Sequence, residues 1–129
     1  MKENTLTITI RRPLQEVFDF TLDPNNTPKW IHSLVSEERT SDDVAIGTEY
    51  RNKNQEGKWS TYVVTEYQPP KKFVMTSGDK NYHVRYAFKE LGPQETEFEY
   101  REWVDTGELE GPFEIAVLEG LKKVIERER

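Results

Sequence analysis

His32 and His83 are the only imidazole groups in this chain. An imidazole that titrates near neutral pH can accept and return a proton, so a histidine in a pocket is a candidate general acid or base. His32 follows Trp30 and Ile31 and is a weak catalytic candidate, although a partly exposed helix end is the more ordinary interpretation. His83 alternates with aromatic residues along a predicted strand, which directs it towards solvent.

Glu102 is the carboxylate whose position most favours acid–base chemistry. It shares strand parity with Phe98 and Tyr100, so strict alternation directs it into the apolar interior. A carboxyl group there has a raised pKa and can serve as general acid or base. The alternative is that the strand ends or bulges here and leaves Glu102 in solvent, because unpaired carboxylates are seldom buried.

Aromatic residues supply the largest group of candidate ligand-binding side chains. The chain has six Phe, six Tyr and three Trp among 129 residues. Any single one is compatible with an ordinary core, but inward tyrosines carry hydroxyl groups that need partners, which a ligand or water in a cavity can provide. We expect a cavity wall formed by Trp30, Tyr50, Tyr86, Phe98, Tyr100, Val117, Leu118 and Leu121.

Several classes of chemistry have no support in the sequence. The absence of cysteine excludes disulfides, thiol nucleophiles and thiolate metal sites. Two isolated histidines do not provide metal-ligand spacing, and no glycine-rich phosphate loop is present. We therefore expect neither a metal nor a cofactor. The net charge of −6 opposes the electrostatic attraction that dominates nucleic-acid binding.

Segments that alternate between apolar and polar residues predict the strands that position these side chains. A period of two suits an antiparallel sheet with one face in solvent. Turn signals separate the segments, as in a meander. The inward face of the fourth strand stays open, because Tyr62 with Val64 competes with Val63 and Tyr67. The predicted strands are 5–10, 33–40, 47–54, 58–67, 72–77, 82–91 and 95–104.

Three helices complete the predicted fold. Proline signals predict the start of two short helices, at Pro13 and at Thr27-Pro28. A third proline, Pro112, begins a long amphipathic helix over 112–129, which would be about 27 Å long. Gly111 is the expected N-cap of the long helix, and Gly120 lies on the shoulder of its apolar face. Since a straight helix cannot fill a strongly curved sheet, we expect a ligand cavity between them. The apolar face comprises Phe113, Val117, Leu118, Leu121, Val124 and Ile125.

Short motifs along nearly the whole chain form a family pattern. They are residues 12–18, Asp23-Pro24 with Pro28-Lys29-Trp30, Ile46-Gly47-Thr48 with Tyr50, residues 64–70 with Phe73, Tyr86-x-Phe88, and Thr96. In this order the chain resembles the helix-grip, START-like (SRPBCC) superfamily, in particular its polyketide cyclase/dehydrase and lipid-transport branch. The resemblance implies one α+β domain over residues 1–129: a curved antiparallel sheet of six to seven strands wrapped around a long C-terminal helix, with two short helices after the first strand. It also implies a deep hydrophobic cavity, but no single reaction.

Three hypotheses for function remain open. The first is binding of a hydrophobic or aromatic small molecule, lipid- or polyketide-like, in the cavity. The second is an enzyme of cyclase or dehydratase type, in which tyrosine hydroxyls with Glu102 or His32 move protons. The third is a co-chaperone-like interaction module, which would have a small, filled interior and an exposed apolar patch. We expect a cytoplasmic monomer or homodimer without a membrane span, since no run approaches 18 apolar residues.

Overall fold

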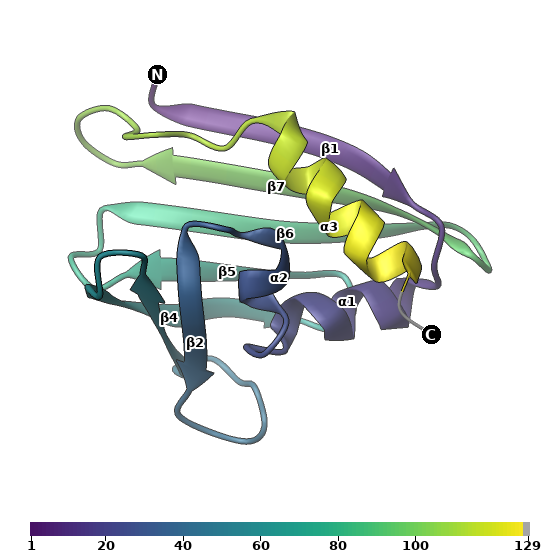
Figure 1. The fold of residues 1–129 in the computed structure, drawn as a ribbon, viewed down its shortest axis with the longest axis horizontal. Coiled ribbons are helices and arrows are strands. Elements are labelled where there is room, and N and C mark those ends of the chain that lie inside the picture. Colours follow the sequence, from purple (N-terminus) through teal and green to yellow (C-terminus); the bar gives the residue numbers. More distant parts are fainter. Residues whose placement is uncertain (128–129) are drawn as a thin grey trace.

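The computed structural model describes residues 1–127, which form an α+β fold with the strands and helices in the predicted order (Figure 1). Two short helices follow the first strand and a longer helix ends the described chain. The strands are β1 Glu3–Ile10, β2 Leu34–Arg39, β3 Glu49–Asn54, β4 Trp59–Gln68, β5 Lys72–Ser77, β6 Tyr82–Gly92 and β7 Glu95–Val104. The helices are α1 Leu14–Leu22, α2 Thr27–Trp30 and α3 Ile115–Arg127.

The seven strands form one antiparallel sheet in the order β1-β7-β6-β5-β4-β3-β2. Strands β2 to β7 form the predicted meander, and β1 pairs with β7, so the first strand lies beside the last one. The sheet curls, and all three helices lie on the same face of it (Figure 1). That face is the concave one, and it contains the core and the site described below.

The strand register brings inward side chains from four strands into rows. One row joins Phe73 of β5, Tyr86 of β6, Tyr100 of β7 and Leu6 of β1. Directly opposite residues of an antiparallel pair lie on the same face, so each row is a continuous strip of the concave surface. The neighbouring row joins Met75, Val84, Glu102 and Asn4, which places a carboxylate among apolar side chains.

A register shift in β4 settles which of its residues face inwards. The pairing of β4 with β5 slips between Val64 and Glu66. An extra residue at such a bulge reverses the alternation beyond it. Tyr62 and Val64 therefore face inwards before the shift, and Tyr67 faces inwards after it, where it packs 6.2 Å from the ring of Phe18. The interpretation with Tyr62 and Val64 inward is confirmed, and of the competing pair Tyr67 is inward whereas Val63 faces the convex side.

Helix α3 begins three residues later than predicted. Gly111 has φ +60°, a left-handed conformation that does not suit an N-cap. The following segment bonds to the sheet instead: the Phe113 amide donates to Glu102 at 2.8 Å, and the Asn4 side-chain amide donates to the Phe113 carbonyl at 2.9 Å. The helix of 13 residues is about 20 Å long, and it buries Leu118, Leu121 and Ile125 as its amphipathic pattern predicts.

Helix α1 fills the centre of the concave face. Its Phe18 ring contacts Phe73 and Phe88 in edge-to-face geometry at 5.8 and 5.3 Å, and its Val17 is fully buried. These contacts make the first short helix a main part of the core rather than a peripheral element.

Among residues 1–127, no helix combines the length and the apolar composition needed to cross a membrane.

Candidate functional site

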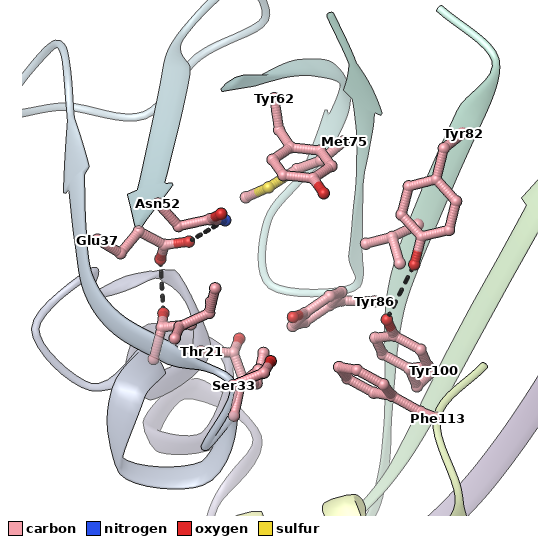
Figure 2. Close-up of a pocket in the computed structure, with 14 residues that line it drawn as sticks. Thr21, Ser33, Glu37, Asn52, Tyr62, Met75, Tyr82, Tyr86, Tyr100 and Phe113 are labelled. Carbon is pink, nitrogen blue, oxygen red and sulfur yellow. Dashed lines mark hydrogen bonds between the residues drawn. The ribbon is translucent and has the colours of Figure 1, made fainter. Parts of the chain in front are cut away.

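A cavity of about 170 Å³ lies between the concave face of the sheet and the two short helices. Figure 2 shows the side chains that surround it. The sheet supplies one side of the cavity: Tyr62, Met75, Tyr82, Val84, Tyr86 and Tyr100. The opposite side comes from the two short helices, the chain after α2, the first residue of β2 and the segment before α3: Thr21, Thr27, Ile31, Ser33, Leu34 and Phe113. Glu37 and Asn52 close the end formed by β2 and β3.

The β2–β3 end of the cavity is polar. The hydroxyl of Thr27 donates to one oxygen of Glu37 at 2.6 Å, and the side-chain amide of Asn52 lies 3.4 Å from the other oxygen (Figure 2). Burial raises the pKa of Glu37, and the hydrogen bonds from Thr27 and Asn52 oppose this rise. A carboxyl group with a raised pKa is therefore directed into the cavity.

The opposite end of the cavity is aromatic. Tyr100 stacks on Phe113 with ring centroids 4.8 Å apart, and Tyr86 lies 5.5 Å from Tyr100 in edge-to-face geometry. Within residues 1–127, the hydroxyls of Tyr62 and Tyr86 have no hydrogen-bond partner. Burial raises the pKa of both groups, so each remains a neutral phenol that can donate to a bound molecule.

Glu102 lies just beyond this aromatic end and is buried, with 2% of its surface exposed. Three donors hold its carboxylate: the Tyr82 hydroxyl at 2.8 Å, the Asn4 side-chain amide at 3.0 Å and the Phe113 backbone amide at 2.8 Å. The inward direction predicted from strand alternation is confirmed, and the solvated alternative is wrong. Its partners use much of its hydrogen-bonding capacity, which favours a structural function over proton transfer.

A second hollow, of about 440 Å³, adjoins the cavity and shares Tyr62, Tyr82 and Phe113 with it. It is more polar than the cavity and carries acidic side chains from the turn after β5 and from the segment before α3. These are Asp79, Glu108 and Glu110, and Glu102 of β7 also lies in its lining. The shared residues place this acidic hollow directly beside the cavity.

Two of the eight predicted ligand-binding residues, Tyr86 and Tyr100, line the cavity. The other six, Trp30, Tyr50, Phe98, Val117, Leu118 and Leu121, are not among its lining residues. Phe98, Leu118 and Leu121 are fully buried in the core instead. An amphipathic pattern has the same form whether its apolar side meets a core or a cavity, so it does not separate the two.

The remaining predicted aromatic residues, Tyr50 and Trp30, pack against the side chains that line the cavity or fix the elements that carry them. The Tyr50 hydroxyl donates to the Leu22 carbonyl at 2.7 Å, which fixes β3 to the end of α1. Trp30 lies between Tyr86, at 6.2 Å, and Phe113, at 6.5 Å, and separates α3 from the cavity. No residue of Ile115–Arg127 lines the cavity, and a Cβ added at Gly120 would meet nothing within 4 Å. The expectation that α3 and Gly120 shape the cavity is therefore wrong.

Neither histidine belongs to the site. His32 is exposed, and its ring lies 3.2 Å from the Lys29 carbonyl, in agreement with the helix-end interpretation. His83 lies on the convex face, where its ring nitrogens contact Thr76 and Asp105, each at 2.9 Å, and its ring stacks on Trp103. Within residues 1–127, no group of three or more His, Cys, Asp or Glu side chains has the arrangement needed to hold a metal ion.

Glu37, Asn52 and Tyr82 are site residues that the sequence did not single out as candidates, and Tyr62 is a site residue whose inward direction the sequence left open. Asn52 shares strand parity with Tyr50, and Tyr82 with Tyr86, so alternation gave a signal for both. Glu37 gave none, because the strand Leu34–Arg39 reads LVSEER and its polar residues occupy both faces.

The curled sheet, the helices on its concave face and the cavity between them define a START-like fold. A START superfamily protein from Mycobacterium smegmatis has this fold, with 14% identity and a TM-score of 0.70 over 98% of this chain and 99% of that one. XoxI from Bacillus cereus matches at 15% identity and a TM-score of 0.72, over 98% of this chain and 96% of that one. NE0264 from Nitrosomonas europaea matches at 11% identity and a TM-score of 0.74, over 98% of this chain and 95% of that one.

Residues 1–128 match the family described as polyketide cyclase/dehydrase and lipid transport, and the chain belongs to that family. The resemblance inferred from the sequence motifs is thus confirmed. A comparison with curated proteins finds no match.

Proposed function

We propose that this protein binds a small, largely apolar molecule in the cavity between the sheet and the two short helices. The observation that carries the proposal is the lining itself, in which four tyrosines face apolar side chains around unfilled space. Preformed pockets with many apolar groups and a few directed polar groups are typical of small-molecule sites. Family membership supports the same function, since the family description includes lipid transport.

The size of the cavity limits the ligand. Its volume of about 170 Å³ is below the roughly 300–1,000 Å³ of ordinary ligand sites, so the enclosed part of the ligand is about the size of one ring with a short side chain. A longer molecule would extend into the adjoining hollow past Tyr62, Tyr82 and Phe113.

A second candidate function, that of an enzyme of cyclase or dehydratase type, rests on Glu37. Its carboxyl group has a raised pKa and faces the same space as the Tyr86 hydroxyl, so the cavity contains an acid–base group and a phenol donor. Glu102 and His32, the residues first considered for this chemistry, do not supply it: three donors hold Glu102, and His32 is exposed outside the cavity. Binding remains the primary proposal because it needs only the cavity.

An interaction module of the co-chaperone type is the third candidate, and the unfilled interior favours the first two over it. Large exposed apolar residues lie on several elements, among them Val35 on β2, Trp59 on β4 and Ile115 on α3. None of these three residues lines the cavity, so they give no reason to prefer a protein partner over a small molecule there.

Uptake of N-phenyl-1-naphthylamine, a neutral dye that fluoresces in apolar surroundings, tests the binding proposal: its phenyl ring matches the size of the cavity, and its naphthalene ring would extend into the adjoining hollow. Ser33 is exposed at the rim of the cavity, so Ser33→Phe should cover the opening and abolish saturable uptake while leaving the fold intact. The matched control is Val35→Phe, an exposed position two residues further along that does not line the cavity. Absence of dye uptake by the wild type, or equal uptake by Ser33→Phe, would contradict the proposal.

A further inference from the structure

The charged side chains that line the cavity and the adjoining hollow are acidic. Among the described residues that line the cavity, Glu37 is charged and none is Lys, Arg or His. The described lining of the adjoining hollow includes Asp79, Glu108 and Glu110 and no basic side chain, and the N-terminal ammonium of Met1 pairs with Glu108. An anionic ligand would therefore meet carboxylates in both spaces, without a basic side chain in either lining to bind it.

Glu37 has neutral donors as its partners within the described chain. Its oxygens accept from Thr27 at 2.6 Å and from Asn52 at 3.4 Å, and both donors are uncharged. The nearby guanidinium of Arg39 is engaged elsewhere, with the carbonyls of Leu22, Ser41 and Asp42. A largely buried carboxylate whose partners are uncharged is further stabilised when a proton or a cation neutralises it, so this end of the cavity is suited to a positive group.

The aromatic rings at the other end of the cavity suit the uncharged part of the ligand. Tyr62 and Tyr82 meet edge to face at 6.3 Å, and the stacked pair of Tyr100 and Phe113 lies across the same space. These rings offer apolar surface to the uncharged part of a ligand.

We propose that the ligand of this cavity carries a basic nitrogen, bound as a cation by Glu37, with an apolar ring packed against Met75, Val84 and the aromatic side chains at the other end of the cavity. This inference rests on the proposed binding function and narrows it to small arylalkylamines or molecules that end in such a group. It excludes carboxylates and phosphates, and fatty acids among them, as preferred ligands.

Three probes of matched size test the inference: 2-phenylethylamine, 2-phenylethanol and 3-phenylpropanoate, which are cationic, neutral and anionic at pH 7. Binding to the wild type at low salt is followed by NMR of the Met75 methyl group, which lines the cavity. The amine should bind at least about tenfold more tightly than the alcohol, because a hydrogen bond to a charged group exceeds a neutral one by such a factor. The propanoate should bind more weakly than the alcohol.

Two variants locate the preference. Glu37→Gln keeps the shape of the side chain and removes its charge, so it should lose the tenfold preference and still bind the alcohol. Glu38→Gln, at the next position of β2 with a 61% exposed side chain, removes a charge outside the cavity and should keep the preference. If Glu37→Gln does not fold, the relative affinities of the three probes for the wild type still test the inference.

The outcomes separate this inference from the binding function beneath it. If the dye enters but the alcohol or the propanoate binds as tightly as the amine, the inference is overturned and the binding function stands. Retention of the preference in Glu37→Gln would also overturn it. If neither the dye nor any of the three probes binds, both proposals fail.

Discussion

The phenol of Tyr82 donates a 2.8 Å hydrogen bond to the buried carboxylate of Glu102. Since this uses the single hydroxyl proton of Tyr82, Tyr100 is the donor in the 3.5 Å contact between the two tyrosine hydroxyls. Asn4 and the Phe113 amide bind the other oxygen of Glu102. One carboxylate thus links β1, β6, β7 and the segment before α3, and it fixes two tyrosines of the cavity.

Loss of this carboxylate should destabilise the fold strongly. Glu102→Ala leaves three buried or half-buried donors without their acceptor, and we expect the free energy of unfolding to fall by about 2–4 kcal/mol. Urea denaturation followed by circular dichroism measures the change. Glu95→Ala, at the exposed start of the same strand, is the control and should alter it by less than about 0.5 kcal/mol. Equal effects of the two substitutions would contradict the structural function of Glu102.

Glu37 should make the protein less stable as the pH rises. Burial raises its pKa in the folded state above the ordinary value of 4.5, so between these two values the folded protein binds more protons than the unfolded chain. The stabilisation from its protonation is complete below pH 4.5 and is lost as the pH passes through the folded-state pKa. Urea denaturation of the wild type and Glu37→Gln over pH 4 to 8 measures this effect.

The difference between the two proteins isolates Glu37, because the other carboxylates titrate in both. Glu37→Gln should gain stability relative to the wild type as the pH rises, whereas the exposed-site variant Glu38→Gln should follow the wild type. A difference that stays constant across this pH range would show that the carboxyl group of Glu37 is not titrating as a buried group.

The strands and the helix order are predictable from the sequence because their signals are local. Alternation and turn residues identify β5 and β7 at their observed bounds and the other strands within two residues. The cavity depends on tertiary contacts that a pattern does not encode. The apolar face of α3 predicts burial correctly, but whether Leu118 meets a core or a ligand depends on where α1 and α2 lie. Glu37 lies in a strand without alternation, so its inward direction follows from the fold alone.

Gly120 provides a test of the corrected position of α3. A Cβ at this helical position meets nothing within 4 Å, and no positive φ is present there. Gly120→Ala should therefore raise the free energy of unfolding by about 0.5–1 kcal/mol, because alanine loses less backbone entropy in a helix. Thermal denaturation measures the gain. The same variant should take up dye as the wild type does. Reduced uptake would show that α3 does form part of the cavity wall.

The central claim is that the concave cavity, and not another hollow, binds the small molecule. The convex face has its own apolar groove, lined by Val63, Val74 and Trp103 among others, so dye uptake alone does not give the location. The chain has two methionines, Met75 in the cavity and Met1 with 65% of its surface exposed. Protein labelled with ¹³C at the methionine methyl groups thus reports on the cavity with one signal and provides an internal control with the other.

Titration of this labelled protein with N-phenyl-1-naphthylamine is the most direct measurement. The Met75 methyl signal should shift and saturate with the dye fluorescence, and it should show nuclear Overhauser effects to the dye ring protons, while the Met1 signal stays unchanged. Saturable fluorescence with an unshifted Met75 signal, and with no Overhauser effect between the Met75 methyl group and the dye, would contradict the account.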